Sequence, residues 1–324
     1  MTLWFRRWAL SASLVLLSGC GPTQTVGAAG AVPQSAPYAS YNAESGVYVN
    51  EFEGSSILGY RSHNKRNKGP TCSVPSGVNV SDIAVDGKGN LLASSQFRTN
   101  SVLVFQGPGM CGPKVATIAD TFGEPFRLAS NDALSGKFVV TNVRMPSEPA
   151  SVSVCTVQAG CTSELTNPNM KDVYSVAMDN SGNCYVTGSD SSNVTTLTYF
   201  AKCAGTGVTT TGYQNPNEFG TLEIDSSGNL VSTSVADSAT LVFVYGGCKR
   251  ACTLLGGPFT LRCCAYSGRL NENSTEFAVL NFTSNQIDVY KYSHQGMTYK
   301  YSFNNGLLES LEPTGVAYNP RSKQ

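Results

Sequence analysis

A short turn motif recurs along this chain at a regular spacing, and it constrains the fold more than any other feature. Its copies are DGKGN at 86–90, DNSGN at 179–183 and DSSGN at 225–229. In each copy an alternating apolar segment enters, Asp begins the turn, Gly stands where a positive φ is favoured, and a second apolar segment leaves. Asp179 and Asp225 lie 46 residues apart, while Asp86 and Asp179 lie 93 apart, about twice that period.

The same period locates three further copies. A degenerate copy lies midway, at 126–142, and a lengthened copy follows at 259–282. One more period reaches 312–324, which has a first strand only, whereas 46–62 has the later strands of a copy without its first strand. A period of this length with about four strands per copy is typical of a β-propeller blade. We therefore predict an all-β, six-bladed β-propeller, closed by pairing of N- and C-terminal strands.

The N-terminus has the features of an export signal. Arg6 and Arg7 precede an apolar run from Trp8 to Leu17, which is too short to span a bilayer. The run leads to LSGC, which resembles the lipobox of bacterial lipoproteins. The resemblance implies cleavage before Cys20 and acylation of that cysteine, with Gly21 favouring the outer membrane of a Gram-negative cell. The alternative is an ordinary signal with an incidental cysteine.

The expected domains follow from these boundaries. Residues 1–19 are a lipoprotein signal peptide, 20–45 are the lipidated cysteine with a flexible tether rich in Gly, Ala, Pro and Ser, and 46–324 are the propeller.

Of the eleven cysteines, the ten other than Cys20 predict five disulfides in an exported protein. Two pairs are close enough in sequence to bridge local hairpins, namely Cys155 with Cys161 and Cys248 with Cys252. Two further candidate pairs are Cys72 with Cys111 and Cys184 with Cys203. Adjacent Cys263 and Cys264 either bridge each other or pair elsewhere. Only His63 and His294 are available and no paired C-x-x-C motif occurs, so a metal site is the weaker hypothesis.

The segments IAVDGKGNLLASS, VAMDNSGNCYVTGS and EPTGVAYNP resemble NHL-repeat and TolB-like six-bladed propellers. The resemblance covers roughly residues 45–324, and the lipobox makes the whole chain similar to bacterial propeller lipoproteins. Because these motifs are structural, they imply a fold and leave the function open.

Alignment of the predicted innermost strands shows one position that is apolar in every copy: Ile83, Leu128, Val176, Leu222, Leu261 and Val316. The next position holds Ala84, Ala129, Ala177, Glu223, Arg262 and Ala317. The opposite charges of Glu223 and Arg262 predict an ion pair between blades five and six. This pair is either structural or reaches the central channel to contact a ligand.

Polar residues near the starts of the innermost strands are the other site candidates, and they are Glu124, Glu312, Asp82 and Arg127. They either contact a ligand at the rim of the propeller or reflect ordinary turn polarity. The run 61–68 is basic and suits phosphate or acidic lipid, although an exposed loop often has this composition.

No catalytic constellation is evident in the sequence. It contains no G-x-S-x-G motif, and no Ser or Cys has an evident His partner. Six-bladed gluconolactonases and paraoxonases hold calcium through Glu, Asn and Asp. Glu124, Asn131 and Asp132 have this ligand chemistry, but their spacing does not match that family.

We therefore expect a lipid-anchored propeller of the bacterial cell envelope that acts as a binding or scaffolding module without a cofactor. Its expected partners are the membrane, through acylated Cys20, and a protein or small molecule at the rim. The alternatives are a calcium-dependent hydrolase or lactonase and a component of an envelope assembly complex. With 22 basic and 22 acidic residues, the chain has no basic excess to attract nucleic acid.

Overall fold

The computed structural model describes residues 46–319, except 52–53, 62–65, 96–98, 108, 132–135, 144–149, 216–219, 237–238, 263 and 309–312. Cys20 and the rest of the predicted signal and tether lie outside the described residues. Among the described residues, no helix is long and apolar enough to cross a membrane.

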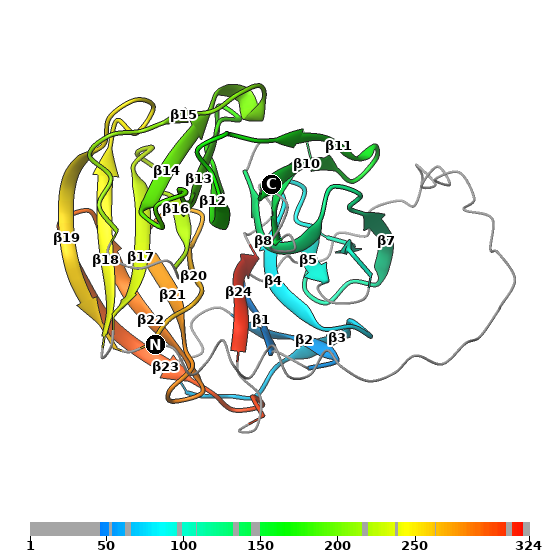
Figure 1. Cartoon of the computed structure of the whole chain (residues 1–324). Coiled ribbons are helices and arrows are strands. Elements are labelled where there is room, and N and C mark those ends of the chain that lie inside the picture. The colour runs from blue at the N-terminus through cyan, green and yellow to red at the C-terminus, as the bar shows by residue number, and fades with distance from the viewer. Residues whose placement is uncertain are drawn as a thin grey trace, which may run out of the picture. The chain divides into compact units, whose positions relative to one another are not determined.

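The described residues form six four-stranded antiparallel sheets, the blades of a β-propeller (Figure 1). The innermost strands of blades one to six are β24 (Pro313–Asn319), β4 (Val80–Val85), β8 (Glu124–Ser130), β12 (Asp172–Met178), β16 (Leu222–Ile224) and β20 (Gly268–Leu270). The second strands are β1 (Gly46–Glu51), β5 (Leu91–Ser95), β9 (Lys137–Val143), β13 (Cys184–Ser189), β17 (Leu230–Ala236) and β21 (Glu276–Asn281).

The two outer strands complete each blade. The third strands are β2 (Ser56–Arg61), β6 (Ser101–Phe105), β10 (Ser151–Thr156), β14 (Thr195–Phe200), β18 (Ala239–Gly246) and β22 (Gln286–Ser293). The outermost strands are β3 (Cys72–Pro75), β7 (Lys114–Ala119), β11 (Gly160–Leu165), β15 (Val208–Thr209), β19 (Thr253–Leu261) and β23 (Gly296–Phe303). A short 3₁₀ segment, η1 (Ala201–Cys203), joins β14 to β15.

Blade one is assembled from both ends of the described chain, as the repeat predicts. Strand β24 pairs with β1 from Gly46–Asn319 to Glu51–Pro313, and Figure 1 shows red β24 beside blue β1. The innermost strands contact one another in the order β24, β4, β8, β12, β16, β20 and back to β24. This pairing closes the ring and leaves no innermost strand without a neighbouring blade.

The recurrent turns join the innermost strand of a blade to its second strand. In DSSGN, Asp225 Oδ1 accepts hydrogen bonds from the backbone N–H groups of Ser227 (2.9 Å) and Asn229 (2.8 Å). The Asn229 amide reaches back to Asp225 Oδ2 at 3.0 Å, and Gly228 has φ 81°. The copies that begin at Asp86 and Asp179 repeat the Asp–Asn bonds, so the Asp, Gly and Asn of the motif each have a defined role.

Apolar side chains fill the space between the blades. The described residues contain six buried clusters, and each lies between two neighbouring blades. Residues of the predicted apolar position, including Ile83, Leu128 and Val176, are fully buried there.

Four disulfides follow the candidate pairs: Cys72–Cys111, Cys155–Cys161, Cys184–Cys203 and Cys248–Cys252. Cys264 is also disulfide-bonded, whereas Cys263 lies outside the described residues. Disulfides form and persist outside the cytoplasm, so these bonds indicate an extracytoplasmic location.

The predicted innermost strand of blade six was wrong. Leu261 ends β19, the nine-residue outermost strand of blade five, and the innermost strand of blade six is β20. The sequence inserts a loop between them, so the equivalent positions are Gly268 and Arg269 instead of Leu261 and Arg262.

Candidate functional site

A cavity of about 390 Å³ opens at one end of the central channel. It lies at the turn face, which we define as the end of the propeller where the innermost strands finish and the recurrent turns lie. Its first lining residue along each innermost strand is Ala84, Ala129, Ala177, Glu223, Arg269 or Ala317. Polar turn residues form much of the wall, including Asn131, Asn180, Ser226, Asn271 and Glu272.

The base of the cavity carries an ion pair. Arg269 Nη1 donates to Glu223 Oε1 at 2.7 Å, and Arg269 Nη2 donates to Asp82 Oδ2 at 2.8 Å. Arg269 and Asp82 are 7% and 0% exposed, so both charges lie away from solvent. Buried charges of this kind are retained only when they are paired and hydrogen-bonded.

Two arginines cross the channel in opposite directions. Arg127 comes from blade three and donates to the carbonyl oxygens of Tyr266 (3.0 Å) and Thr314 (3.2 Å). Arg269 comes from blade six, on the opposite side of the ring, and donates to the Leu128 carbonyl oxygen at 2.8 Å. These contacts satisfy carbonyl groups in β8 and β24 and in the segment just before β20, which the sheets leave unpaired.

Asp82 connects the two arginines. Its Oδ1 lies 3.8 Å from Arg127 Nη1, and its Oδ2 also accepts the Leu128 backbone N–H at 3.0 Å. Together Asp82, Arg127, Glu223 and Arg269 carry two positive and two negative charges, and we call them the channel plug. A balanced set of charges lowers the cost of burying each one.

The surroundings of the channel plug shift the pKa values of Glu223, Arg127 and Arg269. Burial raises the pKa of Glu223, and this effect outweighs the opposing attraction of Arg269. Burial lowers the pKa of Arg127, against the opposing effect of Asp82. For Arg269, burial also lowers the pKa, but Asp82 and Glu223 together raise it above the usual value.

The predicted pairing of Glu223 with Arg262 was wrong, because Arg269 occupies that place. The side chain of Arg262 is 54% exposed and lies over the Tyr299 ring, 4.1 Å from its centroid. Its Nη1 is 4.0 Å from Asp288 Oδ1, on the face opposite the cavity. Of the predicted site residues, Glu223, Arg127 and Asp82 therefore come together, and Arg262 does not join them.

The other rim candidates do not lie at the cavity. Glu124 begins β8 and pairs with Val143, whereas Asn131 follows the end of β8 and lines the cavity. At about 3.3 Å per residue, these side chains are roughly 20 Å apart along the strand. Glu124 and Asn131 therefore cannot hold one calcium ion together. Glu312 and Asp132 lie outside the described residues.

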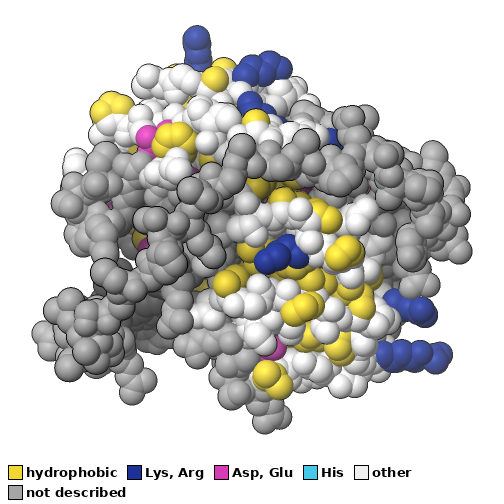
Figure 2. Space-filling view, turned by 90° about the vertical axis from the view of Figure 1, so that its right-hand side faces the viewer, with side chains coloured by type: hydrophobic (Ala, Val, Ile, Leu, Met, Phe, Trp, Pro, Cys, Tyr) yellow, Lys and Arg dark blue, Asp and Glu magenta, His cyan; other side chains and the backbone are white. Residues whose placement is uncertain are grey.

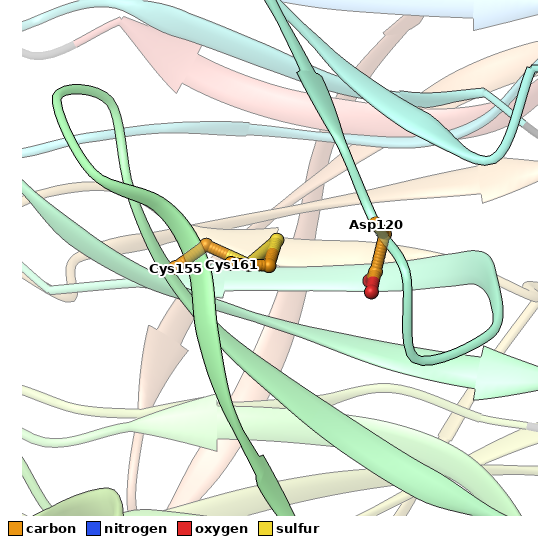
Figure 3. Close-up of side chains that lie close together, drawn as sticks. All are labelled: Asp120, Cys155 and Cys161. Carbon is orange, nitrogen blue, oxygen red and sulfur yellow. A yellow bond between two sulfur atoms is a disulfide. The ribbon is translucent and has the colours of Figure 1, made fainter. Parts of the chain in front are cut away.

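A second group of potential ligand atoms combines Asp120, which follows β7, with Cys155 of β10 and Cys161 of β11 (Figure 3). Atoms of Asp120, Cys155 and Cys161 lie within 4.8 Å of one another. The two sulfurs are bonded to each other, so neither is a thiolate that could coordinate a metal. Asp120 Oδ1 accepts hydrogen bonds from Ser153 Oγ at 2.8 Å and from the Phe122 N–H at 3.0 Å. With the disulfide formed, these three residues make a structural contact between neighbouring blades and do not form a metal site.

Arg269 is the one plug residue that the sequence reasoning missed. It lies in SGRLNENST, where Asn271 takes the place of the turn Asp and accepts the N–H groups of Thr275 (2.7 Å) and Glu276 (3.0 Å). Ser274 takes the place of the turn Gly, with φ 49°. If the copies are aligned on this degenerate turn, Arg269 stands two residues before Asn271, just as Glu223 stands two residues before Asp225.

No protein-family model and no curated protein matches the sequence. Among solved structures, the chain is similar to a chain of a nidogen/laminin complex, with 11% identity and a TM-score of 0.64 over 85% of this chain and 98% of that one. It is also similar to the periplasmic gluconolactonase PpgL of Pseudomonas aeruginosa, with 13% identity and a TM-score of 0.57 over 86% and 99% of the two chains. At these identities the similarity shows the fold, and the fold is the six-bladed β-propeller.

Proposed function

We propose that this chain is a lipid-anchored binding module of a bacterial cell envelope, and that it binds a small hydrophilic ligand in the cavity of the turn face. The cavity is the observation that carries the proposal. Its volume of about 390 Å³ is in the usual range for small-molecule sites. Its amide, hydroxyl and carboxyl lining suits a ligand that offers hydrogen-bonding groups on several sides.

The channel plug supports the binding role. Every charge of the plug already has a partner, and most of its hydrogen-bonding atoms are engaged within the protein. The plug therefore provides a fixed, polar base, and preorganised groups lower the entropic cost of binding.

The lipid anchor is supported by the LSGC sequence at Cys20 and by the extracytoplasmic location that the disulfides indicate. Its test is separate from that of the cavity. In a bacterial host, the chain is expected to incorporate labelled palmitate, and Cys20→Ser is expected to abolish it. Unlabelled wild-type protein would contradict the anchor.

Binding in the cavity is tested by thermal unfolding with a panel of sugars, polyols and amino acids. A ligand at 100 times its dissociation constant adds about 2.7 kcal/mol to the free energy of unfolding and raises the melting temperature. Asn180→Trp, at an exposed wall position, is expected to block that increase, while Ser191→Trp, on the opposite face, keeps it. If the ligand still raises the melting temperature of the Asn180→Trp variant, the binding site lies elsewhere.

A further inference from the structure

Among the described residues, the exposed charges are strongly biased in sign. The whole chain is neutral, yet every described Asp and Glu is buried or half-buried. Most exposed charged side chains of the described residues belong to Lys and Arg, and the side chain of Asp172, on the opposite face, is 49% exposed. Figure 2 shows one face on which Lys and Arg side chains project at several places and Asp and Glu expose little area.

The recurrent turns explain part of this bias. Asp86 and Asp225 are 1% and 6% exposed, and their carboxylates accept backbone and amide hydrogen bonds inside the turns. Asp225 Oδ2 also accepts the Tyr292 hydroxyl at 2.9 Å. The motif thus folds its own negative charges inward at the turn face, while the surrounding basic side chains stay outside.

Exposed cations of the turn face include Arg66, Lys88, Lys114, Lys202, Lys249 and Arg250, which come from four of the six blades. Arg66 follows β2, Lys88 lies in a recurrent turn, and Lys114 begins β7. Lys202 lies in η1, and Lys249 and Arg250 lie between β18 and β19. Each of these segments is at the end where the first and third strands of its blade finish. On the opposite face, the described exposed cations are Lys171 and Arg262, each within 4.0 Å of a carboxylate.

The described chain also begins at this face. Gly46 starts β1 and pairs with Asn319 at the end of β24 and with Arg61 at the end of β2. Cys20 lies 26 residues before Gly46, so the chain from Cys20 enters the propeller at the turn face.

From these observations we propose that the turn face docks on an anionic membrane surface. Exposed basic groups are attracted to an anionic lipid surface, and a lipid at Cys20 would keep this face close to it. Docking brings the cavity mouth to the membrane, so groups presented by the membrane can reach it. This inference uses the proposed lipid anchor only for proximity, since the charge distribution stands without it.

Vesicle sedimentation tests the surface without the anchor. The full chain carrying Cys20→Ser is mixed with vesicles of phosphatidylcholine alone or with added phosphatidylglycerol. We expect tighter binding to the anionic vesicles and loss of this difference in 0.5 M salt, where screening is strong. The apolar segment at Trp8–Leu17 is common to all variants, so it cancels in the comparison.

A matched pair of variants locates the surface. Lys249→Glu with Arg250→Glu is expected to weaken anionic-vesicle binding at least tenfold, whereas Lys171→Glu with Arg262→Glu changes it less than threefold. Equal losses in the two double variants, or binding that does not depend on salt, would overturn the proposal.

Amine labelling of the acylated wild-type chain in vesicles gives an independent readout. Lys88, Lys202 and Lys249 are expected to be protected from acetylation on anionic vesicles compared with neutral ones, and Lys171 is not. Uniform labelling of all four would also refute membrane docking. Absence of palmitate at Cys20 would refute the anchor alone, because the sedimentation result does not depend on it.

Discussion

Two arginines of this propeller have opposite environments. Arg269 is 7% exposed and is bonded to two carboxylates, whereas the side chain of Arg262 is 54% exposed and rests on Tyr299. A buried ion pair is sensitive to loss of one partner, because the other charge stays buried without compensation. An exposed pair contributes little, because water screens it.

Arg269→Met should therefore lower the free energy of unfolding by about 3–5 kcal/mol. Arg262→Met should lower it by less than about 1 kcal/mol. Denaturant unfolding with the disulfides intact measures both changes. If the two variants unfold at the same midpoint, the channel plug does not stabilise the fold.

At the scale of the element, the recurrent turn carries most of the structural information. Its glycine adopts φ 82° in the first copy, 79° in the second and 81° in the third, a region that L-residues rarely adopt. The Asp and Asn side chains then close the loop with bonds between residues only two to four positions apart. The turn is thus defined by its own five residues.

Gly228→Ala isolates the cost of this backbone conformation. No atom lies within 4 Å of the position that a β-carbon would take at Gly228, so no steric contact contributes. We expect a loss of about 1–2 kcal/mol in the free energy of unfolding. The control is Gly296→Ala, which has equally open space and no positive φ. A loss of equal size at Gly296 would rule out backbone strain as the cause.

For the whole molecule, closure of the ring depends on contacts between distant segments. Strand β24 pairs with β1 across nearly the full length of the described chain. The Cys72–Cys111 disulfide joins β3 of blade one to the loop before β7 of blade two, with a separation of 39 residues. The Cys248–Cys252 disulfide spans only 4 residues within one loop.

Loop entropy predicts different effects for these two disulfides. Replacing Cys72 and Cys111 by Ser should cost about 4 kcal/mol, and replacing Cys248 and Cys252 should cost about 2 kcal/mol. Thermal and denaturant unfolding of the two double variants measure the difference. A larger loss for the shorter loop would show that chain entropy does not dominate.

The closing strand also makes stability depend on pH. Glu51 is 5% exposed at the end of β1, and its Oε1 accepts the Leu308 N–H at 2.6 Å. Burial raises the pKa of Glu51 in the folded state, more than that hydrogen bond lowers it. Between the ordinary carboxyl pKa of about 4.3 and this raised pKa, the folded state binds more protons than the unfolded state.

The contribution of Glu51 to the free energy of unfolding should therefore be greatest at low pH and fall as pH rises through this interval. Glu51→Gln keeps an acceptor for Leu308 and removes the titration, so its stability should fall less over the same interval. Unfolding at a series of pH values tests this difference. An unchanged pH dependence in the variant would exclude Glu51 as its source.

The sequence by itself determined the blade count, the closing strand pair, the turns and the two local disulfide pairs, Cys155–Cys161 and Cys248–Cys252, whereas the structure decided between the candidates for Cys72–Cys111 and Cys184–Cys203. These features depend on short-range patterns repeated with a fixed period, and local hydrogen bonds such as Asp225–Asn229 reproduce them in each copy. Only the tertiary structure decided which residue pairs with Glu223, because the long β19 and the loop after it displace the innermost strand of blade six. The tertiary structure also decided which residues form the channel plug and which cations are exposed on the turn face. The bonds from Arg127 to Tyr266 and from Arg269 to Leu128 span 139 and 141 residues across the ring, and no local pattern sets the geometry of such contacts.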